Sequence, residues 1–179
     1  MKHTPLLLRI LGGILIPALL LIGCLHPVLT QSECTALIGL SHRGKPYVFG
    51  KEGPDTFDCS GLTMDACRYF GVDLIHSAKY VAYDDQYMDT DIRHLIPGDL
   101  IFFDTVADKD RYDHVGIWLG MNRFVHASAS EMVVMISEFD EHWQERYSGA
   151  KHIIEPYLIP EINDFLHQLR AEKDPASQA

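Results

Sequence analysis

The second half of the chain alternates apolar and polar residues with a period of two. Five short apolar runs, separated by turn residues, follow Pro97 at positions 100–103, 115–119, 123–127, 132–136 and 152–154. Alternate residues of a β-strand lie on the same face, and several short runs of this kind are typical of antiparallel sheets. The pattern therefore predicts a five- to six-stranded antiparallel sheet.

The first half of the chain instead shows helical spacing. Beyond residue 59, apolar side chains recur at Leu62, Ala66, Tyr69 and Phe70, and Gly71 then provides a typical helix stop. Two further helices are predicted at 33–42 and 77–88. One face of the helix at 33–42 would carry Cys34, Leu37, Ile38 and Ser41. Helices followed by strands predict an α+β domain, with the N-terminal helices packed on one face of the sheet.

Residues 1–23 resemble a bacterial lipoprotein signal peptide. Lys2 and Arg9 form a basic start, and the uncharged apolar run that follows is shorter than the roughly 20 residues of a membrane-spanning helix. The run ends in LIGC at 21–24, which resembles a lipobox. We therefore expect lipidation of Cys24, a membrane anchor and a tether over 24–32. A plain secretory signal and an uncleaved anchor are alternatives, and all three place the domain outside the cytoplasm, in the cell envelope.

Length and charge narrow the class of protein further. The 179 residues fit one domain, placed at 33–158 and followed by a C-terminal helix and tail at 159–179. The formal net charge is −10 and basic residues do not cluster, so no nucleic-acid partner is expected. No Cys/His group has metal-ligand spacing, so no metal or other cofactor is expected. Cys34 and Cys67 either form a disulfide or remain free thiols.

Cys59 is the candidate nucleophile. It follows Asp58, a good helix N-cap, so its sulfur belongs to the first turn of the helix. Unpaired backbone N–H groups and the helix dipole favour a thiolate at such a position. The alternative is a small buried residue, which is what most free cysteines are.

A nucleophilic cysteine needs a base, and a third group must orient that base. Imidazole suits the first task near neutral pH. His114 begins a predicted strand and shares one face with Gly116 and Trp118, whereas Val115 shares the apolar face. We expect His114 to point away from the apolar face, toward the helix of the nucleophile, and His126 on the next strand to orient it.

The turn between these strands decides whether the two histidines meet. A two-residue turn pairs positions whose numbers sum to 243 and places His126 on the wrong face. If residues 120–122 form a three-residue turn with Asn122 left-handed, the sum is 242 and His126 faces Gly116. His126 and His114 would then be diagonal neighbours, at a separation of roughly 7 to 8 Å that the two imidazole rings can bridge. Because Asn tolerates the left-handed region, we predict the three-residue turn.

Six segments together resemble the NlpC family of bacterial cell-wall cysteine peptidases, which have a compact papain-like fold. In order, they are PYVFG at 46–50, FDCSGL at 57–62, PGDLIFF at 97–103, HVGIWLG at 114–120, FVHA at 124–127 and YSGAK at 147–151. The resemblance covers most of the chain beyond the signal segment, from about residue 36 to residue 154.

The resemblance implies hydrolysis of peptidoglycan stem peptides, typically between D-γ-glutamate and a diamino acid. Carried over by position, Cys59 is the nucleophile, His114 the base and His126 the group that orients it. Tyr47 resembles the tyrosine near the oxyanion and the bound stem. Asp58 and Ser60 resemble the polar pair that holds a free α-amine of the substrate, although Asp58 alone also fits a simple helix cap.

Three departures from the family pattern concern the substrate site. Phe49 stands at the usual tryptophan, Lys51 stands at a usual glycine, and the arginine-containing segment reads LIHS at 74–77. A CHAP-type amidase or a thiol acyltransferase would use the same dyad, and a non-catalytic wall-binding lipoprotein could keep the same fold. The FVHA segment favours the peptidase over these alternatives.

Overall fold

The computed structural model describes residues 29–106 and 112–154. The predicted signal peptide, Cys24 and the C-terminal helix at 159–179 lie outside the described residues. Within them, no helix has both the length and the apolar character needed to cross a bilayer.

One six-stranded antiparallel sheet organises the domain, in the order β1-β6-β2-β3-β4-β5. The strands are β1 Met88–Thr90, β2 Leu100–Phe103, β3 His114–Gly120, β4 Arg123–Ser128, β5 Val133–Glu138 and β6 Tyr147–His152. The predicted antiparallel α+β fold is confirmed. The last predicted run, at 152–154, was misplaced, because β6 ends at His152 and shares only that residue with the run. The short edge strand β1, with its largely exposed side chains, was not predicted.

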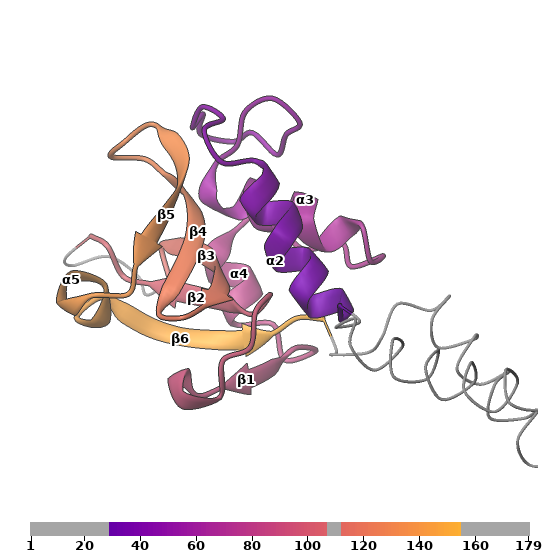
Figure 1. Cartoon of the computed structure of the whole chain (residues 1–179), viewed down its shortest axis with the longest axis vertical. Coiled ribbons are helices and arrows are strands. Elements are labelled where there is room, and N and C mark those ends of the chain that lie inside the picture. Colours follow the sequence, from indigo (N-terminus) through magenta and orange to yellow (C-terminus); the bar gives the residue numbers. More distant parts are fainter. Residues whose placement is uncertain (1–28, 107–111, 155–179) are drawn as a thin grey trace, which may run out of the picture.

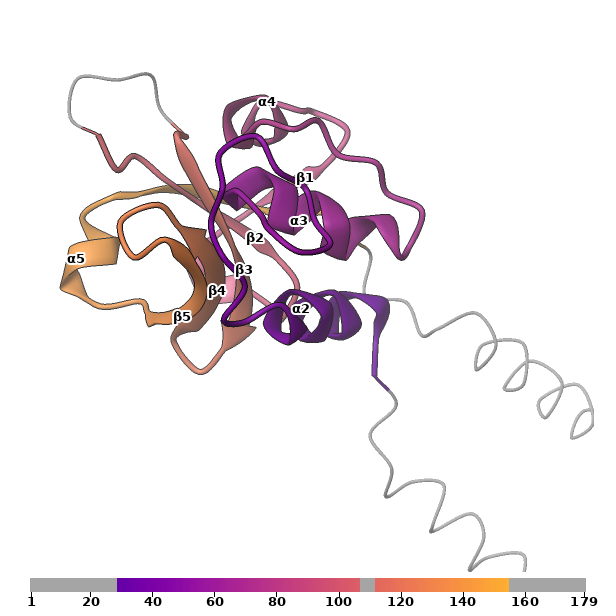
Figure 2. The same ribbon diagram turned by 90° about the horizontal axis from the view of Figure 1, so that it is seen from above.

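The helices divide between the two sides of the sheet. They are α2 Gln31–Ser41, α3 Cys59–Arg68, α4 Ala78–Ala82, the 3-10 helix η1 Ile92–His94 and α5 Glu141–Gln144. Figures 1 and 2 show α2, α3 and α4 on one side and α5 on the other. The predicted helix at 77–88 was too long, since α4 ends at Ala82.

Helix α2 differs from the prediction in its start and in its buried face. It begins inside the predicted tether, where Thr30 and Glu33 form a capping box. Its buried residues are Ser32, Thr35, Ala36 and Gly39, whereas Leu37 is 48% exposed. A Cβ on Gly39 would lie 2.6 Å from Ile117 Cδ1. The apolar spacing predicted the wrong face because close packing on β3 requires small residues rather than large ones.

Each face of the sheet has its own apolar core. The core under α3 joins Leu62 and Ala66 to the β3 residues Val115 and Ile117. The core under α5 instead contains Phe103 and Phe124, with Trp143 packed against it. Since residues alternate along a strand, the side chains of His114 and His126 belong with the second core.

The turn between β3 and β4 combines features of both predicted alternatives. Met121 and Asn122 both have positive φ, at 50° and 59°, so the turn itself has two residues. Next to the turn, Gly120 pairs with Arg123. An irregularity between Trp118 and Gly120 then shifts the register, so that Trp118 pairs with Phe124 and the numbers of paired residues sum to 242. The predicted register is therefore confirmed, while the three-residue turn was wrong: a bulge supplies the extra residue.

Candidate active site

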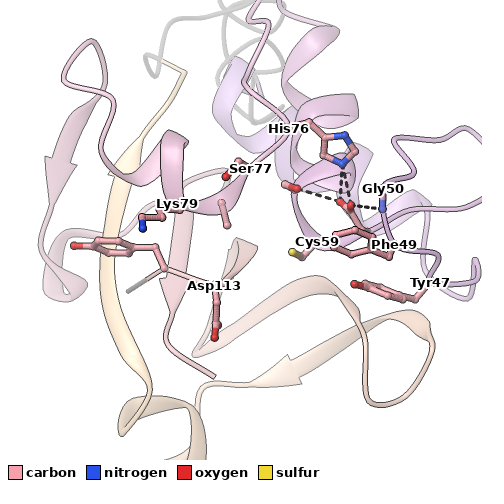
Figure 3. A pocket seen from close by; sticks show the side chains of 12 residues that line it. Tyr47, Phe49, Gly50, Cys59, His76, Ser77, Lys79 and Asp113 are labelled. Atoms are coloured by element: carbon pink, nitrogen blue, oxygen red, sulfur yellow. Dashed lines mark hydrogen bonds and ion pairs between the residues drawn. The ribbon is translucent and has the colours of Figure 1, made fainter. Parts of the chain in front are cut away.

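Cys59 is the first residue of α3 and lines an open cavity of about 440 Å³. We call this the sulfur cavity; its walls include Tyr47, Phe49, His76, Lys79 and Asp113. Backbone N–H groups of Val115, Ser60 and Cys59 hydrogen-bond the sulfur. Figure 3 shows the Cys59 sulfur and the Tyr47 hydroxyl directed toward the same opening. The Val115 contact places the sulfur beside the first residues of β3, one position from His114.

The Cys59 thiol is protonated in the unliganded site, contrary to prediction. Burial first, and the negative charge of Asp58 second, raise the pKa of Cys59 to about 11, although the three backbone hydrogen bonds lower it. The helix dipole favours the thiolate, but loss of hydration and a neighbouring carboxylate outweigh it here. The residue that caps the helix thus also opposes ionisation of the nucleophile.

The two predicted histidines form a hydrogen-bonded pair on one face of the sheet. His114 Nε2 lies 2.8 Å from His126 Nδ1, and the ring centroids are 5.0 Å apart in an edge-to-face arrangement. A Cβ on Gly116 would lie 2.7 Å from Phe124 Cδ2 and 3.4 Å from His126 Cβ, so the glycine provides the space for this pair. His126 Nε2 in turn lies 2.9 Å from Ser137 Oγ.

Burial keeps both imidazoles neutral. Loss of hydration lowers the pKa of His114 to about 4, partly offset by Asp113, and it lowers the pKa of His126 to about 3, with His114 as the second cause. Both rings therefore carry a single proton near neutral pH. If His114 donates from Nε2 to His126 Nδ1, then His126 donates from Nε2 to Ser137, and His114 Nδ1 keeps a free lone pair.

The expected direction of His114 relative to α3 was wrong. Helix α3 packs on the Val115 face, whereas the imidazoles lie on the face covered by α5, where Trp143 stacks on His114 with ring centroids 5.8 Å apart. Within the described part of the chain, the Cys59 sulfur is not hydrogen-bonded to the His114 ring. Cys59 packs on the Val115 face and the His114 ring lies on the other face, both near the start of β3. Catalytic hydrogen bonds commonly tighten only when substrate binds.

A second cavity, of about 420 Å³, contains both imidazoles. We call this the imidazole cavity; its walls also include Thr105, Ser130, His142, Trp143 and Arg146. It shares none of its described lining residues with the sulfur cavity. Cys59 and His114, the candidate nucleophile and base, thus line different cavities.

Comparison with known proteins identifies the family. The model of the NlpC/P60 family matches residues 44–152, more than half of the chain. The chain belongs to the NlpC/P60 family. Over 152 residues it is 36% identical to the probable endopeptidase NlpC of Escherichia coli, covering 78% of this chain and 97% of that protein. The family predicted from the six segments is therefore confirmed.

Two more distant relatives cover only parts of longer proteins. A γ-DL-glutamyl hydrolase of Bacillus subtilis is 31% identical over 145 residues, which are 79% of this chain and 32% of the hydrolase. The structure of NlpC2 from Trichomonas vaginalis superposes with a TM-score of 0.64 at 30% identity, covering 69% of this chain and 46% of that one. The chain thus spans less than half of either protein.

Asp58 and Ser60 lie in the sulfur cavity but are already engaged with each other and with the backbone. Asp58 accepts hydrogen bonds from Gly61 N–H, Gly50 N–H and Ser60 Oγ, and His76 Nε2 lies 2.9 Å from both of its oxygens. Figure 3 shows His76 and Gly50 converging on this carboxylate. The NlpC/P60 segment that usually holds an arginine therefore supplies a histidine partner for Asp58.

Tyr47 and the departing residue Phe49 complete this side of the site. Burial raises the pKa of Tyr47, with Cys59 and Asp58 contributing next, so its hydroxyl remains a hydrogen-bond donor. Phe49 is 85% exposed at the cavity rim. An exposed ring at the position of the usual NlpC/P60 tryptophan is available to contact a ligand.

Sequence reasoning missed three residues of the site. Ser137 is a polar residue within an apolar strand, and that contrast was the one available signal. Trp143 belongs to the four-residue helix α5, which is too short to produce a periodic pattern. His76 falls in a polar stretch where only the departure from the family pattern drew attention.

The other two cysteines of the described residues, Cys34 and Cys67, are free thiols. Cys34 is half-buried, and Cys67 is fully buried, which raises its pKa to about 12. The open question of a disulfide between them is therefore answered in favour of two thiols. Among the described residues, no group of three or more His, Cys, Asp or Glu side chains could hold a metal ion.

Proposed function

We propose that this protein is a peptidoglycan endopeptidase that cuts stem peptides with Cys59 as nucleophile and His114 as base. The proposal rests above all on the hydrogen-bonded chain from His114 through His126 to Ser137, placed one residue from the N–H group that binds the Cys59 sulfur. The names of the relatives, an endopeptidase and a γ-glutamyl hydrolase, support the same reaction class.

The reaction begins from a neutral thiol and a neutral imidazole. The Cys59 proton passes to His114 Nδ1 as sulfur attacks the carbonyl carbon, and the His114 proton then passes to the leaving nitrogen as the C–N bond breaks. Water, deprotonated by His114, cleaves the thioester and restores the thiol. His126 and Ser137 act as positioning residues because they fix the orientation and the tautomer of His114.

The acyl half of the substrate enters the sulfur cavity. Tyr47 is placed to donate a hydrogen bond to the developing oxyanion, because its hydroxyl faces the same opening as the sulfur. Asp58 and Ser60 form a wall of this cavity. His76 already contacts both oxygens of Asp58, so we propose that these residues recognise a free α-amine of the stem in exchange for that contact.

We also propose that the domain works outside the cytoplasm, held to a membrane by lipid on Cys24. The support is the sequence at 1–24 and the wall-directed chemistry of the proposed reaction. Mass spectrometry of the protein isolated from membranes tests the anchor: a diacylated Cys24 at the N-terminus is expected, and an unmodified chain starting at Met1 contradicts it.

Defined muropeptides test the activity. Incubation with the purified protein and mass spectrometry of the fragments should reveal cleavage within the stem, typically after D-γ-glutamate, that is abolished in Cys59→Ala. Release of the whole stem from the sugar would instead identify an amidase, and transfer to an added amine an acyltransferase. Binding without turnover would leave only a wall-binding role.

A further inference from the structure

The imidazole cavity differs in charge from the rest of this acidic protein. The chain carries a formal charge of −10, yet among the described residues that line this cavity no side chain is a carboxylate. Among the described lining residues, the permanently cationic side chain is that of Arg146, which lies with His142 beside the hydroxyls of Thr105, Ser128 and Ser130. The sulfur cavity, in contrast, has two carboxylates in its walls, Asp58 and Asp113, together with Lys79.

The proton transfers of the proposed mechanism assign a substrate half to each cavity. The imidazole that takes the thiol proton must deliver it to the leaving nitrogen, so that nitrogen lies against His114. Cys59 keeps the acyl half on its own side. Since His114 lines the imidazole cavity and Cys59 lines the other, the departing amine and the groups attached to it occupy the imidazole cavity.

We infer that Arg146 binds a carboxylate of the leaving group, so that the enzyme selects diamino acids that carry one there. This inference rests on the proposed function. The Arg146 side chain is 33% exposed, and its Nη1 donates to the His142 carbonyl at 2.7 Å, which holds the guanidinium at the cavity. Its acidic neighbour Glu145 is 70% exposed and 3.8 Å from Nη1, a weak surface contact.

The guanidinium suits this role by its geometry. Nη1 donates to the backbone, whereas Nη2 and Nε make no hydrogen bond with the described residues and can together bind both oxygens of one carboxylate. The hydroxyls of Ser128 and Ser130, which line the same cavity, can add hydrogen bonds. The site therefore fits a diamino acid with a free carboxylate, such as diaminopimelate, better than the corresponding carboxamide.

Three synthetic stem tripeptides test the inference. Each is L-alanyl-D-γ-glutamyl-meso-diaminopimelate: one is unmodified, one is amidated at the α-carboxyl and one is amidated at the distal carboxyl of the diamino acid. We expect one of the amidations to lower kcat/KM of the natural enzyme on the order of 10- to 100-fold, as loss of a charged hydrogen bond predicts. The sensitive position identifies the carboxylate that Arg146 binds.

The variant Arg146→Gln should remove this discrimination. It should lower kcat/KM for the unmodified tripeptide to the level of the sensitive amide, with little effect on that amide. Arg93→Gln is the matched control, because Arg93 is exposed and pairs with Asp91 away from both cavities. The inference would be overturned if Arg146→Gln lowered kcat/KM equally for all three tripeptides, or if neither amidation changed kcat/KM of the natural enzyme.

Binding separates failure of the inference from failure of the proposed function. Free meso-diaminopimelate is titrated calorimetrically into the Cys59→Ala protein and into the same protein with Arg146→Gln. Weaker binding after the second change supports the carboxylate site even if no tripeptide is cut. Equal affinity, or no binding to either, refutes it even if cleavage of the stem is observed.

Discussion

Raising the pH should accelerate alkylation of Cys59 about tenfold per unit from pH 7 to pH 10. With a pKa of about 11, only about one thiol in ten thousand is ionised at pH 7, against about one in a hundred for an ordinary thiol of pKa 9.0. The thiolate is the species that reacts with iodoacetamide, so the rate follows its fraction. Peptide mass spectrometry of timed samples gives the rate at each cysteine separately.

Replacing Asp58 by Asn adds a second measurement. Asn is as good an N-cap as Asp, so α3 keeps its first turn, while the charge that raises the Cys59 pKa after burial is removed. Alkylation at pH 8 should become roughly 3- to 10-fold faster. The half-buried Cys34, beside Glu33 instead of Asp58, provides the internal control and should not change.

Two results would refute this account. A rate at Cys59 that is constant between pH 6 and pH 9 would mean that the sulfur is already anionic and paired with a protonated His114. Slower alkylation in Asp58→Asn would mean that the carboxylate assists ionisation. In either case, the balance of burial against backbone hydrogen bonds at the start of α3 would be reversed.

Three further predictions concern the imidazole pair. Gly116→Ala should lower the free energy of unfolding by about 1 to 3 kcal/mol, measured by urea titration, because its Cβ would lie 2.7 Å from Phe124; an unchanged midpoint would contradict the close packing. The pKa values of His114 and His126 are about 4 and about 3 in the folded protein, against 6.5 in the unfolded chain, so the unfolded chain binds protons first as the pH falls. Each imidazole should therefore lower the free energy of unfolding by about 2 kcal/mol at pH 5 relative to pH 7 or above. Calorimetry between pH 7 and pH 4 should therefore show a falling midpoint, less steep in His126→Gln. Ser137→Ala should lower kcat several-fold with little change in KM, and an unaltered kcat would exclude Ser137 as a positioning residue.

The sequence allowed the main elements of the fold and the pairing of the histidines to be predicted. The period-two runs located most of the sheet, and counting across the β3–β4 turn placed His126 against Gly116. The turn itself was misjudged, because a bulge and a longer loop have the same effect on the register. The sequence pattern therefore predicts which residues of β3 and β4 face each other more reliably than it predicts the backbone conformation of the turn that joins them.

Properties that depend on several elements at once were not predicted. The protonation of Cys59 follows from how deeply β3 and Asp58 enclose the sulfur, which helix position alone does not reveal. The face of α2 was misassigned because Gly39 and its small neighbours pack against β3. The stacking of Trp143 on His114 requires the return of the chain after β5, which no periodic pattern indicates.

The separation of the two cavities sets an order of events in the proposed reaction. The cleaved amine fragment can depart from its own side while the thioester is intact, and the volume that it vacates borders the imidazole that must next activate water. The amine fragment therefore leaves, and water enters, through the same opening of the imidazole cavity. The reaction should therefore follow a ping-pong kinetic mechanism, in which an amine that enters the imidazole cavity competes with water for the acyl group of the thioester.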